Sequence, residues 1–362
     1  MQRSYLIPLG ALMLSLTIGA NVTNAFQYQE RNSDEASTLS TQAEAAFDSH
    51  HYSEAVDLLE RVVALRPDDA QTRYRLGRVL HNQERFIESI AAFRQALRLN
   101  PNFADAYHAL GVAYNDSKHF GDAIDAFKHA LQLLPGRAET LSELAYSYSM
   151  SGQSQEAIDY CMEALRIRPD LNAVTYNTLG VAYFNLEKRE QALEAFEHAI
   201  KLEPNNAMFY NNLGYTYAGS GQVKDALVAY QQAIRLKPDY AVALNNLGTT
   251  LCASRQYRDA IEMLKKAVKS STNMPEAHYN LGCVLSLAGH KKEAIQSYKN
   301  AIMLKADFAE AHVNLAVLYL QEGQRELALE QYALLKSVDP ILASKLFNLI
   351  YRDKIISVRT DN

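Results

Sequence analysis

The pattern of apolar and polar positions along this chain repeats every 34 residues. In residues 207–240, numbered here as positions 1 to 34 of one period, four residues follow the i, i+3, i+4, i+7 spacing of one helix face. They are Tyr210, Leu213, Gly214 and Tyr217. A second stripe with helical spacing follows, formed by Ala226, Leu227, Tyr230, Ala233 and Ile234. Pro238 ends the period, because proline cannot continue a helix. A fixed period of this length predicts stacked helix–turn–helix units rather than one globular domain.

Four columns of residues mark the period along the chain. A Leu-Gly pair in the first helix begins at Leu76, Leu110, Leu179, Leu213, Leu247 and Leu281. An alanine in the second helix recurs at Ala123, Ala157, Ala192, Ala226, Ala260, Ala294 and Ala328. A proline near the end of the unit recurs at Pro67, Pro101, Pro135, Pro169, Pro204, Pro238 and Pro340. A glycine at position 15, where a helix end favours a left-handed residue, occurs as Gly152, Gly221, Gly289 and Gly323.

These residues together resemble the tetratricopeptide repeat. The family often has tryptophan at position 4, where this chain has Tyr107, Tyr176 and Tyr210. The resemblance implies an all-α fold: a right-handed α-solenoid superhelix of about nine helix–turn–helix repeats and a C-terminal capping helix. The expected repeats are residues 36–69, 70–103, 104–137, 138–171, 173–206, 207–240, 241–274, 275–308 and 309–342. The first is degenerate, because Ala43 and Ala46 replace the expected Gly and Tyr.

The two ends of the chain differ from the repeats. Residues 1–25 are typical of a secretory signal peptide: Arg3 is the only charge, and Thr23-Asn24-Ala25 offers small residues for cleavage after Ala25. The alternative is an uncleaved membrane anchor, since an uncharged stretch of about 17 residues is at the lower limit for spanning a bilayer. We expect residues 26–35 to be a disordered linker. Residues 343–362 are expected to form a capping helix and a polar tail.

Charge and cysteine content narrow the possible partners. The chain of 362 residues carries a net charge of -5, which argues against nucleic acid as the main partner because phosphate binding needs a basic face. The leader predicts an exported protein, periplasmic or secreted, that meets a membrane only if the leader stays uncleaved. The three cysteines form no CxxC pair, so no zinc or other metal site is indicated. We interpret them as buried free thiols, with a Cys252–Cys283 bridge between adjacent first helices left open.

One column of the first helices predicts a binding surface. Positions 2, 6, 9 and 13 project away from the core-facing positions, and the family resemblance places the first helices on the concave side. Position 6 reads Arg75, Ala109, Glu143, Thr178, Asn212, Asn246, Asn280 and Asn314. An asparagine amide can accept one hydrogen bond and donate two, so a column of amides suits both main-chain groups of an extended peptide. It is similar to the asparagine ladder in the repeat region of O-linked N-acetylglucosamine transferases, whose catalytic domain has no counterpart here.

We expect the ligand-contacting set to extend beyond position 6. Its members are Asn212, Asn246, Asn280, Asn314, Thr178, Tyr215, Met208, Asn177, Asn211 and Asn245, with Val174, Val181 and Leu287 as further apolar candidates. Three alternatives remain open for the asparagines: solvated groove residues, bonds to neighbouring helices within the protein, or a column inherited by repeat duplication. Repeats two to four instead carry charged or polar residues on this face. They are Gln71, Arg75, Arg78, Asn82, Asp105, Asp116, Glu139 and Glu143, which are also consistent with internal ion pairs.

Other features of the sequence argue against alternative functions. Chaperone-binding members of the family clamp a terminal carboxylate with basic residues at positions 2, 5 and 6, of which this chain has only Arg75. His278 and His312 occupy the aromatic position 4 and are interpreted as packed side chains rather than metal ligands. No nucleophile elbow, phosphate-binding glycine loop or zinc-protease motif occurs, so we expect no enzyme and no cofactor.

Two functional hypotheses follow from these observations. The first is a non-enzymatic, exported scaffold for protein–protein interactions that binds extended polypeptide segments through the asparagine column. The second is an accessory subunit of an envelope export or assembly complex, which would dock through its convex face or its ends. In both hypotheses the partner is a protein or peptide.

Overall fold

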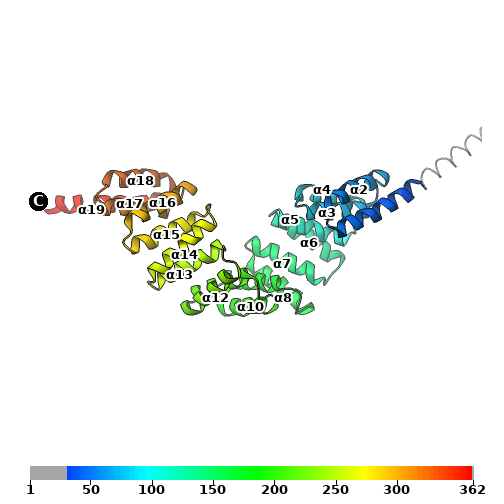
Figure 1. Cartoon of the computed structure of the whole chain (residues 1–362), viewed down its shortest axis with the longest axis horizontal. Coiled ribbons are helices and arrows are strands. Elements are labelled where there is room, and N and C mark those ends of the chain that lie inside the picture. Colours follow the sequence, from blue (N-terminus) through cyan, green and yellow to red (C-terminus); the bar gives the residue numbers. More distant parts are fainter. Residues whose placement is uncertain (1–30, 361–362) are drawn as a thin grey trace, which may run out of the picture. The chain divides into compact units, whose positions relative to one another are not determined.

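A computed structural model describes residues 31–360, with side chains described as far as residue 351. The predicted signal peptide and residues 26–30 lie outside this range. The described chain divides into two compact units, which meet in sequence between Leu171 and Asn172. Both consist of consecutive antiparallel helix pairs (Figure 1). The prediction of an all-α solenoid is confirmed.

Unit 1 holds four helix pairs. An N-terminal helix spans residues 31–48. It is followed by α2 (Tyr52–Leu65), α3 (Ala70–Asn82), α4 (Phe86–Leu99), α5 (Ala104–Asp116), α6 (Phe120–Leu133), α7 (Ala138–Met150) and α8 (Ser154–Ile167). The first helix includes residues 31–35, which the sequence had placed in a disordered linker. Arg66 explains this difference, because its guanidinium donates to the Ser33 carbonyl oxygen at 2.6 Å and holds the first turn against the end of α2.

Unit 2 holds five helix pairs and a terminal helix. They are α9 (Ala173–Asn185), α10 (Arg189–Leu202), α11 (Ala207–Gly219), α12 (Val223–Leu236), α13 (Ala241–Ala253), α14 (Tyr257–Ser270), α15 (Pro275–Leu287), α16 (Lys291–Leu304), α17 (Ala309–Gln321), α18 (Arg325–Val338) and α19 (Pro340–Thr360). The last helix packs on α17 and α18 through Ala343, Leu346 and Ile350, which are buried. Within residues 31–360, no helix has both the length and the apolar character needed to cross a membrane.

In the repeats that have glycine at position 8, close approach of the two paired helices depends on this residue. In unit 1, a Cβ added to Gly111 would lie 2.6 Å from the Phe127 ring. In unit 2, a Cβ on Gly180 would lie 2.6 Å from the Phe196 ring. A side chain at this position would therefore push the large residue of the second helix out of the core.

The turn between paired helices places position 15 in the left-handed region. Four glycines, among them Gly221 with φ 74°, occupy it where the sequence predicted a helix end. In other repeats a residue with a side chain takes the same conformation. These are His50, Glu84, Lys118, Glu187 and Arg255, with φ between 59° and 64°. The turn geometry is thus imposed by helix packing even where the residue disfavours it.

Candidate functional site

The first helices of unit 2 carry two adjacent columns of asparagine. We call Asn177, Asn211 and Asn245 the position-5 column; they are buried. We call Asn212, Asn246, Asn280 and Asn314 the position-6 column; they are partly exposed. Because successive residues of a helix are turned by about 100°, one column faces the neighbouring repeat while the other borders solvent.

Hydrogen bonds join the two columns across each repeat boundary. The Asn212 Nδ2 donates to the Asn177 Oδ1 at 2.8 Å. The same bond recurs from Asn246 to Asn211 at 3.1 Å and from Asn280 to Asn245 at 2.9 Å. We call these three contacts, together with the bond at Asn314, the amide rungs.

The last rung replaces the position-5 amide by a phenol. The Asn314 Nδ2 donates to the Tyr279 hydroxyl oxygen at 3.2 Å, again across 35 residues. The same Nδ2 lies 3.6 Å from the Cys283 Sγ, and Tyr298 donates its hydroxyl proton to that sulfur at 3.4 Å. Burial is the main cause that raises the pKa of Tyr279 to about 12. This rung is therefore a neutral polar network, like the other three.

The rungs use part of the hydrogen-bonding capacity of the position-6 column. Each of these side chains donates through Nδ2 to the preceding repeat, and an amide nitrogen carries two N–H donors. The Asn212 Oδ1 also accepts from Asn211 at 3.3 Å, and the Asn246 Oδ1 accepts from Asn245 at 3.4 Å. A carbonyl oxygen has two lone pairs. Within the residues that the structure describes, one N–H and at least one oxygen lone pair of Asn212, Asn246 and Asn280 thus remain outside the rungs. Asn314 differs, because its Nδ2 contacts both Tyr279 and Cys283.

The structure therefore supports one of these alternatives in part: the asparagines do bond neighbouring helices within the protein. It also changes the roles in the expected ligand-contacting set. Asn177, Asn211 and Asn245 are 8%, 6% and 7% exposed, so they anchor the position-6 column rather than face a ligand. Thr178 is buried as well. Sequence spacing identified both columns, but the bond between them depends on how successive repeats pack.

Exposed apolar side chains lie at position 2 and position 9 of the same helices. Val174 and Met208 are exposed, and so is Val242, which the sequence analysis missed although it continues the same column. Tyr215 is 52% exposed, and its ring centroid lies 5.1 Å from that of Phe184. Of the other apolar candidates, Leu287 is exposed and Val181 is half-buried. Position 2 of repeats five to seven is thus an apolar column one helical turn from position 6.

In unit 1 the corresponding face carries several ion pairs. The Arg75 guanidinium lies 3.0 Å from the Glu44 carboxylate, and Arg137 pairs with Asp105 at 2.6 Å. Arg168 pairs with Glu139, and His81 lies 2.7 Å from the Asp116 carboxylate. The expectation of internal ion pairs on this face is confirmed for Arg75, Asp105 and Glu139. Exposed pairs of this kind contribute little to stability.

Burial disfavours the charged forms of two titratable groups of unit 1. Burial lowers the pKa of His108 to about 4, and the nearby Arg137 charge acts in the same direction. Burial likewise raises the pKa of Glu143, although the Asn115 Nδ2, 3.3 Å from its carboxylate, favours the charged form. Neither group is paired with an opposite charge that would offset its desolvation.

The surroundings of His312 and of the three cysteines indicate a structural role rather than a metal site or a disulfide. His312 is buried, with its Nδ1 2.8 Å from the Gln331 Oε1 and its Nε2 3.0 Å from the Ala306 carbonyl oxygen. Within residues 31–351, no three His, Cys, Asp or Glu side chains gather as a metal site. The three cysteines are free thiols, so Cys252 and Cys283 are not bridged in this structure.

Comparison with known proteins agrees with the fold. Models described as tetratricopeptide repeat match residues 40–102, 83–138, 136–205, 177–241, 217–281 and 309–341, and one described as TPR repeat matches residues 288–323. No functionally curated protein matches the chain.

Solved structures with a similar fold have low sequence identity. One is the crystal structure of the APC/C hetero-tetramer Cut9-Hcn1, with a TM-score of 0.57 and 19% identity over 82% of this chain. This chain spans only 58% of that structure's length. Another is Pseudomonas aeruginosa pilF, with a TM-score of 0.51, 20% identity and coverage of 57% of this chain and 95% of pilF. At these identities the likeness concerns the fold alone. The family models together span nearly all the described repeats, and the chain therefore belongs to the tetratricopeptide repeat family, whose members are scaffolds for protein–protein interactions.

Proposed function

We propose that this chain is an exported, non-enzymatic scaffold that binds extended polypeptide segments along the position-6 column of unit 2. The amide rungs carry this proposal. They fix four partly exposed amides, one per repeat, and three of these (Asn212, Asn246 and Asn280) keep a donor and an acceptor outside the rung. Main chain in a helix or sheet has already used these groups, so the complementary ligand is main chain that is extended and unpaired.

The rungs also affect the cost of binding. A free asparagine side chain loses rotamer freedom when it binds a ligand, at about 0.5–1.5 kcal/mol per immobilised side chain. Asn212, Asn246 and Asn280 have already lost that freedom to the position-5 column. The hydrogen bonds they offer are therefore preorganised.

Hydrogen bonding alone gives a weak complex. Each net hydrogen bond contributes about 1 kcal/mol, so four to eight bonds correspond to millimolar to micromolar affinity at best, once ordering costs are included. The exposed Val174, Met208, Val242 and Tyr215 supply the apolar contacts that selectivity requires. A segment that alternates apolar side chains with accessible main chain fits both features.

Replacing the column tests the proposal. We expect the variant Asn212→Ala/Asn246→Ala/Asn280→Ala/Asn314→Ala to lose capture of partner proteins from an extract of the source cells, with its helical circular dichroism unchanged. The control replaces four exposed polar residues of the second helices in the same unit: Glu194, Gln231, Lys266 and Lys292. If the position-6 variant retains the same partners as the control, the column does not bind them.

The exposed side of the terminal helix favours a second candidate function. Ile341 is 72% exposed, and Phe347 and Leu349 are also exposed on α19. We therefore keep the proposal of an accessory subunit of an envelope export or assembly complex that docks through its C-terminal end. Removal of residues 343–362 would abolish partner capture under this proposal, whereas the position-6 variant would not.

The export part of the proposal rests on residues 1–25 and needs its own test. We expect protein recovered from the cell envelope or medium to begin at Phe26. Mass spectrometry of the mature N-terminus checks this. Recovery of an intact Met1 on soluble cytosolic protein would overturn it.

A further inference from the structure

A cavity in unit 1 lies between the N-terminal helix, α2 and α3, away from the amide rungs. Its apolar lining comes from Ala43, Phe47, Leu59 and Val79, and two guanidinium groups border it. The volume is about 60 Å³. Since a water molecule needs about 10–15 Å³ by the same measure, the cavity has room for a small aliphatic side chain.

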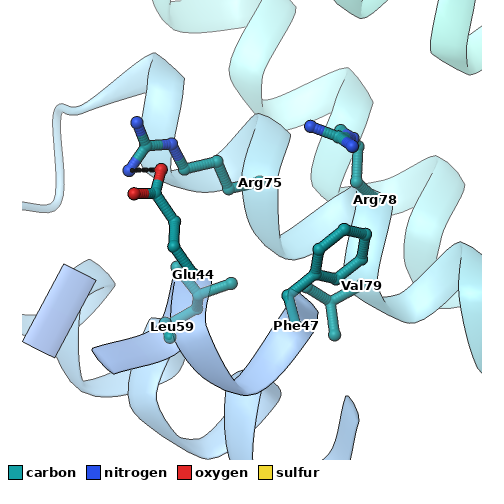
Figure 2. Close-up of a pocket in the computed structure, with 7 residues that line it drawn as sticks. Glu44, Phe47, Leu59, Arg75, Arg78 and Val79 are labelled. Atoms are coloured by element: carbon teal, nitrogen blue, oxygen red, sulfur yellow. Dashed lines mark ion pairs between the residues drawn. The ribbon is translucent and has the colours of Figure 1, made fainter. Parts of the chain in front are cut away.

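The two arginines at this cavity differ in their partners. Arg75 pairs with Glu44 at 3.0 Å and also donates to the Ser40 hydroxyl at 3.2 Å. Arg78 is exposed, and within residues 31–351 it has no ion-pair partner. Figure 2 shows Arg75 turned toward Glu44 while Arg78 lies over the Phe47 ring. The cavity is therefore bordered by one unbalanced positive charge.

Stacking holds Arg78 in a geometry that suits a carboxylate. Its guanidinium carbon lies 5.3 Å from the Phe47 ring centroid and 5.9 Å from that of Tyr74. A guanidinium that lies over aromatic rings keeps the N–H groups of its edge available, and these match a carboxylate in a bidentate arrangement. Because the side chain is already ordered, less freedom is lost when an anion binds.

From this arrangement we propose that the cavity docks a partner segment in which an aliphatic residue is adjacent to an acidic one. The aliphatic side chain enters the space between Leu59 and Val79. The neighbouring side-chain carboxylate binds the edge of Arg78. This second binding surface is independent of the amide rungs. It selects ligands by charge, whereas the rungs bind main chain of any sequence.

Peptide binding to the whole mature chain tests the proposal. The probes are fluorescein-labelled decapeptides with amidated C-termini and a Gly-Ser background that carries Leu-Glu, Leu-Gln or Ala-Glu at the centre. Fluorescence anisotropy should show about tenfold tighter binding of Leu-Glu than of Leu-Gln, because a charge-assisted bond is lost. Arg78→Gln should abolish this preference, and Arg78→Lys should retain only part of it.

Matched controls separate the cavity from general charge effects. Arg98→Gln removes an equal charge from an exposed site on α4 and should leave the tenfold preference unchanged. Circular dichroism of Arg78→Gln should match the wild type, since the side chain is exposed. The proposal is overturned if the wild type does not distinguish Leu-Glu from Leu-Gln, or if Arg78→Gln keeps the preference.

Two other occupants are distinguished in the same experiment. A Leu-Gln peptide with a free C-terminal carboxylate that binds more tightly than amidated Leu-Glu would show that the site binds chain termini instead. Sedimentation velocity of the wild type and of Arg78→Gln tests whether a second copy of the chain occupies the cavity. A dimer that the substitution dissociates would mean that the copy fills the cavity, and it would overturn the peptide proposal.

Discussion

Units 1 and 2 use the same helix pair but place different chemistry on the same face of their first helices. In unit 1 this face carries ion pairs such as Arg75–Glu44 and Arg137–Asp105. In unit 2 it carries the amide rungs, which are neutral and closed by hydrogen bonds between adjacent repeats. The glycine at position 8 meets a large side chain in both units. The repeat thus fixes the packing positions, whereas the side chains at positions 2, 6 and 9 can differ between the two units.

The largest expected effect concerns the packing that both units share. Gly111→Leu in unit 1 and Gly214→Leu in unit 2 should each destabilise the chain by about 3 kcal/mol, because the added side chain would occupy the space of Phe127 or Tyr230. Urea unfolding followed by circular dichroism measures this. Gly121→Ala is the matched control, because its Cβ would meet nothing within 4 Å and alanine favours the helix. Equal stability of all three variants would contradict the shared packing.

The second-largest expected effect is a pH dependence of the free energy of unfolding, which arises from buried groups in unit 1. The pKa of His108 is lowered to about 4 in the folded chain from the ordinary 6.5, so the unfolded chain binds more protons between these values. Stability is therefore complete above pH 6.5 and falls by up to about 3 kcal/mol as the pH drops toward 4. The raised pKa of Glu143 acts in the opposite direction, since a carboxyl that takes up its proton more readily in the folded chain favours the folded state as the pH falls.

The measurement is the urea midpoint as a function of pH for the wild type and for His108→Gln. The variant should lose most of the stability change between pH 6.5 and 4. The same slope in both proteins would show that His108 does not titrate in this window.

The next comparison sets one amide rung against one ion pair. Asn211→Ala should destabilise the chain by about 1–2 kcal/mol, because it leaves the Asn246 amide without its buried acceptor. Glu44→Ala should cost less than about 1 kcal/mol, because the Arg75–Glu44 pair borders solvent. Chemical denaturation of both variants gives the two values. If Glu44→Ala destabilised the chain more than Asn211→Ala, the result would contradict our view that unit 2 has the more ordered face.

The smallest expected effect tests the turns of both units. Glu84→Gly in unit 1 and Glu187→Gly in unit 2 should each stabilise the chain by about 0.5–1 kcal/mol, because both residues have φ of 59°. Thermal unfolding of the variants beside Gly221→Ala, which should be destabilised by a similar amount, measures this. A loss of stability in both glycine variants would mean that the glutamate side chains contribute more than their strain costs.

The sequence predicted the fold well because the period repeats the same packing positions many times. The residues favoured at position 8, at position 15 and at the closing proline each follow from local physical requirements and recur in many of the repeats. The N-terminal helix was partly missed, because residues 31–35 are polar and their order depends on Arg66, 33 residues away from Ser33. Such a contact leaves no pattern in the local sequence.

The candidate site was predicted less completely. The spacing of Asn212, Asn246, Asn280 and Asn314 identified the position-6 column, but not the burial of Asn177, Asn211 and Asn245 beside it. That burial depends on the angle between successive helix pairs, which the sequence does not specify. Arg78 was noted only as one charged residue, because Phe47, its stacking partner, lies in the degenerate first repeat.

A crystal structure of the mature chain with a captured partner segment tests the central proposal most directly. The account predicts an extended segment along unit 2, with its main-chain N–H and C=O groups within hydrogen-bonding distance of the Asn212, Asn246 and Asn280 side chains and the rungs intact. A partner bound elsewhere, with these three side chains bonded only to the position-5 column, would contradict it.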